Sequence, residues 1–333
     1  MDYINYVKQS PIAGFSGFGG GATGLNFASA GVTPVGPYNG DRGIVGGGGG
    51  GGLVNNISYT TISTSGSWSD FGDMNQSLYG PDGVSGGDGE LGEVQASRGL
   101  IWGGDTTGSH VNTNTIQYLA TATTANTQDF GDLTADLKLS AGNFSNGWRC
   151  CYCGGGTNGR EPIDYVATMT TGNAQDFGDL PASAGSGGSG QVQNGTNGFS
   201  FKFSNTAINV NTIDTTGNAT SFGSLSSTIG NNQGCGSNLT YGLHSGTNSE
   251  FGIDRFTMAT SGNGTDVGNL SANRWGSGGC SNMNYLLVVA GYDDGNNINS
   301  TEYRDFSSSG NASNFGNLNY TKRGLAGLSG AAS

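Results

Sequence analysis

The sequence predicts an all-β protein: a six-bladed β-propeller of about four strands per blade, with an N-terminal extended arm. Three observations favour this fold: a glycine content unsuited to long helices, a motif that recurs six times, and chain ends that supply complementary parts of one repeat unit. The chain has 333 residues, of which 65 are glycine and only 33% are hydrophobic. Glycine destabilises a helix by about 1 kcal/mol relative to alanine, so short strands and tight turns are expected.

Composition favours a folded chain and limits its partners. Aromatic residues make up 10% of the sequence, and a net charge of −12 is small for this length, whereas disordered chains are poor in aromatics and highly charged. The acidic balance disfavours a nucleic-acid partner. No apolar run approaches 18 residues, so no membrane insertion is expected. The start, MDYINYVKQSPIAGF, lacks the basic and apolar regions of a secretion signal.

The recurring motif is clearest in TGNAQDFGDL, residues Thr171–Leu180. It predicts a Gly-Asn hairpin turn followed by an outer strand. Asp176 and Asp179 are expected to accept backbone hydrogens at the strand ends, and Phe177 to fill the gap between neighbouring blades. The six residues at the position of Phe177, which we interpret as structural repeat anchors, are Phe71, Phe130, Phe177, Phe222, Val267 and Phe315.

Two further stretches precede each copy of the motif in the same order. An alternating stretch such as PIDYVATM is typical of a half-buried strand, and an apolar run such as YLLVVAGY suits a strand buried on both faces. A small-residue segment such as LAGLSG completes the unit. Most units span 45–48 residues, a length typical of kelch and WD40 propeller blades. A β-helix is the main alternative, but its coils are shorter.

The phase of the repeat predicts how the ring closes. The chain enters the pattern at Asp41–Gly49, the second strand of a unit, and leaves it at Arg323–Ser333, the first strand. We therefore expect Gly324–Gly330 to pair beside Ile44–Gly48, so that residues 38–333 form a closed propeller without exposed sheet edges. The segment Gln76–Ser97 is longer than its counterparts and rich in acids and glycine, which predicts an exposed loop.

Residues 1–37 differ in composition from the repeats and are interpreted as an arm. Their apolar side chains have no core of their own, so they are expected to bury themselves against a partner; packing on the same propeller is the alternative. The candidate attachment residues are Tyr3, Ile4, Tyr6, Val7, Ile12, Phe15 and Phe18.

No catalytic, metal or cofactor site is predicted. The odd number of cysteines (Cys150, Cys151, Cys153, Cys235 and Cys280) favours buried small residues over disulfides or zinc. Cys235 and Cys280 are not expected to pair, because adjacent blades should place them about 10 Å apart. His110 and His244 fall in different units, and the strings Gly87–Glu90 and Asp293–Asn297 match no complete calcium loop. These observations predict that the protein is not an enzyme.

Residues 41–333 resemble the kelch-like, glycine-rich propellers in structural proteins of marine and cyanobacterial tailed phages. The resemblance is carried by Arg-Gly-apolar-apolar-x-Gly-Gly, Ile-x-Tyr, Thr-Gly-Asn-Ala-x-Asp-Phe-Gly-Asp-Leu and Arg-Gly-Leu-Ala-Gly-Leu-Ser. Ser224, Val267, Asn269 and Asn317 depart from the motif.

The resemblance implies a virion protein displayed on the particle, associated with a tail fibre or adaptor and serving attachment to the host surface. Residues 1–37 would then be a virion-anchoring arm that binds other virion proteins or a second copy of the chain, and a host surface glycan would be a further partner. The alternatives are a capsid decoration protein and, in another class, a carbohydrate-binding propeller module or a propeller enzyme.

Overall fold

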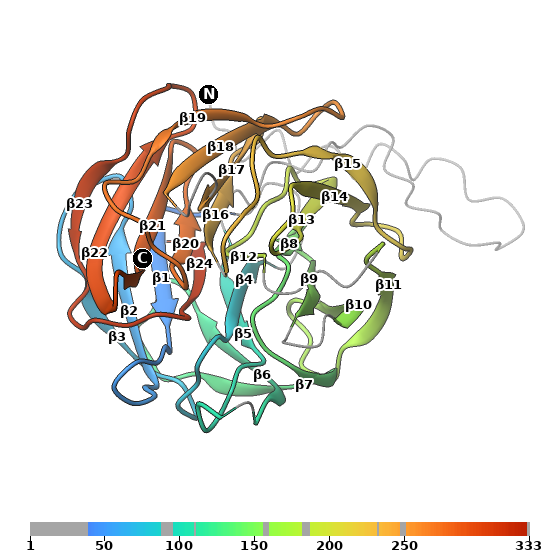
Figure 1. Cartoon of the computed structure of the whole chain (residues 1–333). Coiled ribbons are helices and arrows are strands. Elements are labelled where there is room, and N and C mark those ends of the chain that lie inside the picture. Colours follow the sequence, from blue (N-terminus) through green and yellow to red (C-terminus); the bar gives the residue numbers. More distant parts are fainter. Residues whose placement is uncertain are drawn as a thin grey trace, which may run out of the picture.

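Among the residues that the structure describes, twenty-four short strands form six small, almost wholly antiparallel sheets arranged in a ring, a six-bladed β-propeller (Figure 1). The computed structural model describes residues 39–331 apart from 88–95, 110, 156–159, 182–186, 232 and 247–250. Within these ranges the chain is all-β, with no helix. The predicted fold class is therefore confirmed.

Each of the first three blades has four strands, which follow one another in the order stated from the axis outward. The first blade consists of β24 (Ala326–Gly330), β1 (Arg42–Gly46), β2 (Asn56–Thr61) and β3 (Ser69–Asp73). The second consists of β4 (Asp82–Gly86), β5 (Arg98–Trp102), β6 (Thr113–Ala120) and β7 (Gln128–Leu137). The third consists of β8 (Asn143–Ser145), β9 (Arg149–Gly155), β10 (Arg160–Ala167) and β11 (Gln175–Asp179).

The fourth blade differs from the others at the axis. Its strands are β13 (Asn197–Phe201), β14 (Ala207–Thr212) and β15 (Thr220–Ser224), and the short β12 (Gly188–Ser189) pairs in parallel with the fifth blade. The fifth blade consists of β16 (Gln233–Ser237), β17 (Tyr241–Gly246), β18 (Gly252–Thr257) and β19 (Thr265–Asn269). The sixth consists of β20 (Gly278–Ser281), β21 (Tyr285–Asp293), β22 (Asn296–Asp305) and β23 (Ser313–Asn317).

The two ends of the chain close the ring within one blade. β24 pairs antiparallel with β1, from Arg42 opposite Gly330 to Gly46 opposite Ala326. The pairing predicted from the phase of the repeat is therefore confirmed. Because β1 has its inner edge covered by β24, neither strand presents open backbone groups there.

The segment Gln76–Ser97 corrects the sequence-based expectation. Its residues Asp82–Gly86 form β4, the innermost strand of the second blade, and all five are buried. The prediction of an exposed loop is wrong because strands next to the axis have little room for side chains and accept glycine, serine and even aspartate. Residues 88–95 of this segment lie outside the described residues.

The repeated Phe-Gly motif forms a belt that joins each outer strand to the next blade. The carbonyl of Phe177 accepts from Gly217 N at 2.7 Å, and Asp179 N donates to Asn218 Oδ1 at 3.0 Å. A β-carbon added at Gly178 would lie 2.5 Å from the backbone of Gly217, so only glycine permits this approach. The other five motif glycines, Gly72, Gly131, Gly223, Gly268 and Gly316, likewise abut the turn of the following blade.

The belt explains most of the motif. Asp176 accepts from Gly178 N at 3.0 Å, as predicted. The turn asparagine has a role that sequence reasoning missed, because it accepts a backbone hydrogen from the preceding blade at five of the six joints. The bonds run from Asp73 to Asn126, Asp132 to Asn173, Asp179 to Asn218, Ser224 to Asn263 and Asn269 to Asn311.

Candidate binding surfaces at the two ends of the propeller

The structure describes the predicted repeat anchors but not the predicted attachment residues. Residues 1–37, with all seven candidate attachment residues, lie outside the described residues. The six repeat anchors lie in β3, β7, β11, β15, β19 and β23, where their side chains are 2–9% exposed and pack in hydrophobic clusters. Their position assigns them to packing between the blades.

The five cysteines are free and buried. Burial raises the pKa of Cys150 to about 11 and moves the pKa of Cys235 and Cys280 well above the ordinary value, so these thiols stay protonated and poorly nucleophilic. Within the described ranges, no group of three or more His, Cys, Asp or Glu side chains is placed to hold a metal ion.

Cys235 and Cys280 remain unpaired for a reason other than the one expected. Adjacent blades lie closer than a sheet spacing near the axis: a β-carbon at Gly279 would be 2.5 Å from Cys235 N. The two thiols diverge, because Cys235 Sγ faces Gly188 whereas Cys280 Sγ faces Gly43. The two cysteines stay unpaired because their thiols point in different directions, and not because the blades are far apart.

A ring of small polar side chains surrounds the axis at one end of the propeller. Each blade contributes one polar residue from its innermost segment, and this residue always lies opposite the second residue of the blade's second strand. These residues are Ser85, Ser145, Gln193, Ser237, Ser281 and Ser329, all at most 1% exposed. Four hydroxyl bonds link neighbouring blades: Ser85 to Ser329 O, Ser329 to Ser281 O (2.6 Å), Ser281 to Ser237 O (3.2 Å) and Ser237 to Gln193 O (2.8 Å).

Asn39, the first described residue, closes the centre of this ring. Its Nδ2 donates to Ser237 O at 2.6 Å and to Ser281 Oγ at 3.0 Å, while its Oδ1 accepts from Gln191 Nε2 at 2.6 Å. Gln191 Oε1 in turn accepts from Ser85 N at 2.7 Å. Asn39 thus contacts inner strands on several sides of the axis, and its side chain is 3% exposed. We call this end of the propeller the Asn39 end.

Among the described residues, Asn39 and Gln191 occupy the axis at this end and bond to inner strands around it. Propellers commonly enclose a channel between their inner strands. In this chain a β-carbon at Gly327 would lie 2.2 Å from Gly279 O, and one at Gly40 would lie 1.8 Å from Gly330 O. Backbone therefore packs directly on backbone around the axis. Candidate binding surfaces are the two ends and the joints between blades.

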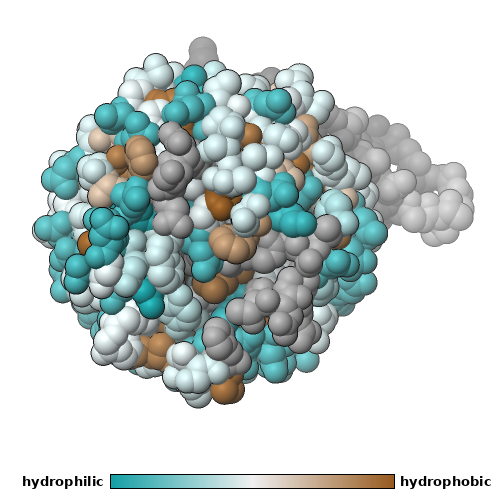
Figure 2. All heavy atoms as spheres, viewed as in Figure 1, coloured by the Kyte–Doolittle hydropathy of each residue, from teal (hydrophilic) through white to brown (hydrophobic). Residues whose placement is uncertain are grey.

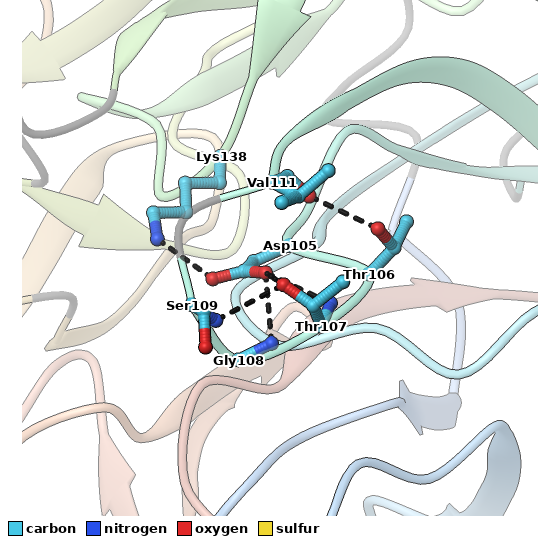
Figure 3. A network of polar contacts seen from close by, with 7 residues as sticks. All are labelled: Asp105, Thr106, Thr107, Gly108, Ser109, Val111 and Lys138. Carbon is cyan, nitrogen blue, oxygen red and sulfur yellow. Dashed lines mark hydrogen bonds and ion pairs between the residues drawn. The ribbon is translucent and has the colours of Figure 1, made fainter.

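The opposite end, which we call the loop end, carries the connections between the second and third strands of each blade. In the second blade this connection is organised by a buried ion pair (Figure 3). Lys138 Nζ lies 3.1 Å from Asp105 Oδ2, and Asp105 Oδ1 accepts from Thr107 N at 3.0 Å and Gly108 N at 2.9 Å. Both charged side chains are at most 2% exposed, so the pair holds the loop in one conformation and is closed to an external ligand.

Two other buried titratable groups lie near the axis. Asp82 accepts from Ser140 N at 3.0 Å and from Ser140 Oγ at 2.6 Å, and burial raises the pKa of its carboxyl to about 7. His244 Nε2 donates to Gly187 O at 2.9 Å, and burial lowers the pKa of its imidazole to about 4. Both side chains are fully buried. Each is held by hydrogen bonds within the propeller, although His244 Nδ1 is buried without a hydrogen-bond partner. His110 lies outside the described residues.

The solvent-facing surface is mixed in character. The face in Figure 2 is mostly hydrophilic or neutral, with hydrophobic residues scattered across it. The large exposed apolar side chains are Val111, Trp148, Met169, Phe203, Leu239 and Met283. Trp148, Met169, Leu239 and Met283 belong to turns at the Asn39 end, whereas Val111 and Phe203 belong to the loop end.

No protein-family model matches the chain, and no curated protein matches it either. In the part of the chain that the structure describes, no helix is long and apolar enough to cross a membrane.

Proposed function

We propose that this protein is a structural and adhesive protein of a tailed-phage particle. Residues 1–37 attach the propeller to other virion proteins, and the loop end is presented to the host surface. The supporting observation is Asn39 on the propeller axis. The preceding residues join the propeller at the centre of one end, so a tether there directs the other end outward.

The central tether has a mechanical consequence that suits display. A load applied through residue 39 enters a hydrogen-bond network that reaches the inner strands of the fourth, fifth and sixth blades directly. The load is thus shared among these blades and the first blade, which the backbone enters at Arg42. Gly40 packed on Gly330 holds the same segment against the closing strand.

Within this proposal the propeller is held on a tail fibre or adaptor, and capsid decoration is the alternative placement. Both placements use the same arm and differ in which particle protein receives it. A host surface glycan is the proposed target of the loop end, and the role is binding without catalysis.

The experiment deletes residues 1–34 from the chain in a phage whose genome encodes it. We expect the shortened protein to remain a soluble propeller and to be missing from purified particles, measured by quantitative mass spectrometry against the major capsid protein. The matched control is Val111→Ala, at a side chain 54% exposed on the loop end, which should join particles normally. Normal occupancy of the shortened chain would refute the proposal. An averaged map of the wild-type particle would separate tail from capsid placement.

A further inference from the structure

Three neighbouring joints of the propeller are closed by an arginine that stacks on a tyrosine of its own blade. The arginine is the first residue of the second strand, and its Nη1 donates to a carbonyl at the start of a turn in the next blade. The stacks are Arg42 on Tyr59 (4.8 Å), Arg98 on Tyr118 (4.4 Å) and Arg149 on Tyr165 (4.5 Å). The acceptors are Thr121 O (3.0 Å), Thr168 O (3.2 Å) and Ile213 O (2.8 Å).

The fifth blade makes the same joint with the two residues exchanged. Tyr241 now begins the second strand, and Arg255 occupies the tyrosine position on the third. The guanidinium still stacks at 4.9 Å and still donates to the next blade, at Phe306 O and Ser308 O, both 3.0 Å away. The joint therefore contains a guanidinium stacked on an aromatic ring, whichever of the two strands supplies the arginine.

The fourth blade has neither partner. Asn197 begins its second strand, and Val210 stands at the tyrosine position, in the register that Tyr59 and Tyr165 have in their blades. A cavity of about 270 Å³ lies there, lined by these two residues and, across the joint, by Met258 and Ala259. Met258 directly follows its third strand, as Thr121, Thr168 and Ile213 follow theirs. The cavity thus occupies the place of the guanidinium and the phenol ring.

Two details support this assignment. Phe222 also lines the cavity and is 9% exposed, whereas its counterpart Phe177, which Arg149 covers, is 2% exposed. At the joint between the sixth and first blades, Tyr285 and Tyr303 fill the corresponding positions with two rings. The cavity at that joint is smaller, about 150 Å³, and is lined by Ile62 of the first blade. Cavity size follows the side chains at these two positions.

We propose that the cavity between the fourth and fifth blades binds the guanidinium group of an arginine side chain from a partner protein. A guanidinium offers five donors in a planar fork and stacks on flat surfaces. Threonine and asparagine residues line the cavity around Phe222 and offer oxygen acceptors there. Asn211 Nδ2 donates to Gly217 O at 3.2 Å and holds the hairpin wall of the cavity in place.

The arginine comes from another protein. Residues 1–38 contain no arginine, so the chain's own arm does not supply one. The cavity lies at the Asn39 end, because Asn197 begins its strand there as Arg42 does in the first blade. A protein that receives residues 1–37 would face it. This placement of the partner rests on the proposed function, whereas the guanidinium chemistry rests on the cavity alone.

The test is a titration of the full-length chain with N-acetyl-arginine amide, followed by NMR with assigned backbone amides. The matched ligand is N-acetyl-citrulline amide, which has the same shape without the charge. We expect shift changes centred on Met258 and Ala259 and at least about tenfold weaker binding of the citrulline analogue, as the loss of charge-assisted hydrogen bonds implies. Equal binding of the two ligands, binding elsewhere, or no binding would overturn the proposal. None of these outcomes bears on particle attachment, which involves residues 1–34.

A variant gives an independent test by rebuilding the missing joint within the chain. Asn197→Arg combined with Val210→Tyr should fill the cavity, abolish the arginine-specific binding and raise Tm. Val111→Ala, remote at the loop end, should bind as the wild type does. If the double variant folds and still binds the arginine ligand with unchanged affinity, the cavity is not the site. If it fails to fold, the wild-type titration still decides.

Discussion

Two buried titratable groups, Asp82 and His244, should make opposing contributions to the pH dependence of this protein's stability in mildly acidic solution. The pKa of the Asp82 carboxyl is raised from 3.8 to about 7, and the pKa of the His244 imidazole is lowered from 6.5 to about 4, in each case chiefly by burial. Both groups prefer to be neutral in the fold. Their effects on the free energy of unfolding have opposite signs.

The size of each effect follows from linkage. Between pH 4 and 7 the folded chain keeps the proton of Asp82 that the unfolded chain has released. The free energy of unfolding therefore falls as pH rises, by about 1.4 kcal/mol per unit and roughly 4 kcal/mol in all. Between pH 6.5 and 4 the unfolded chain protonates His244 and the folded chain does not. The free energy of unfolding then falls as pH falls, by roughly 3 kcal/mol in all.

Asp82→Asn separates the two contributions. Asparagine keeps an acceptor for Ser140 N and cannot ionise, so of these two dependences only that of His244 remains. We expect the free energy of unfolding of this variant to rise by about 1.4 kcal/mol per pH unit from pH 4 to 6.5 and then to level off. The wild type should stay level over the same range and decline towards pH 7.

The assay is urea unfolding at a series of pH values, with linear extrapolation to water. His244→Gln is the complementary variant and should show only the decline from pH 4 to 7. A level profile for Asp82→Asn, or a wild-type profile that changes by about 1.4 kcal/mol per unit between pH 4 and 6.5, would refute the reasoning.

Two further perturbations test the belt and the axis. Gly268→Ala should lower the free energy of unfolding by about 3 kcal/mol or more, because the β-carbon would lie 1.9 Å from Gly310 O at a φ of +140°. The control Gly217→Ala, with no atom within 4 Å of its β-carbon, should change Tm little. Equal effects of the two substitutions in thermal unfolding would contradict the role of the belt. Asn39→Ala should destabilise by about 2–3 kcal/mol in urea unfolding, since it leaves buried partners of its amide such as Gln191 Nε2 with fewer hydrogen bonds; an unchanged midpoint would show that the axis does not depend on Asn39.

The arrangement of blades could be predicted from the sequence because each blade corresponds to one copy of a local sequence repeat. The burial pattern recurs between units, as in β11 and β3, where one buried aromatic side chain follows two exposed residues and precedes a half-buried glycine. Ring closure was also predictable, since β24 and β1 complete one unit. The strand β4 was missed because Asp82–Gly86 has no apolar period, and position next to the axis replaces hydrophobicity as the reason for burial.

The axial network was beyond the reach of the sequence. Asn39 bonds to residues 198 and 242 positions away, and no local pattern marks such a contact. A weak signal existed in the serines that recur near the ends of inner strands, such as Ser237 and Ser281. Likewise, the missing arginine at Asn197 becomes visible only when the joints are superimposed through their strand register.

The two ends of the propeller are built on different principles, and this difference favours the roles proposed for them. At the Asn39 end, four blades use one turn in which an asparagine side chain accepts the backbone hydrogen three residues later: Asn146, Asn194, Asn238 and Asn282. At the loop end, the corresponding connections differ in length and composition: 47–55, 103–112, 202–206 and 294–295.

A repeated turn presents nearly the same atoms from each blade, which suits attachment around a central tether. Unequal loops present a different surface from each blade, and an asymmetric partner can be recognised only by such a surface. In the described part of the chain, Asn39 and Gln191 occupy the axis at the Asn39 end, so the centre is not a site for a ligand there. Under the proposed function, the loops are therefore assigned to recognition of a host molecule, and the Asn39 end with the arginine cavity beside it to recognition of the particle.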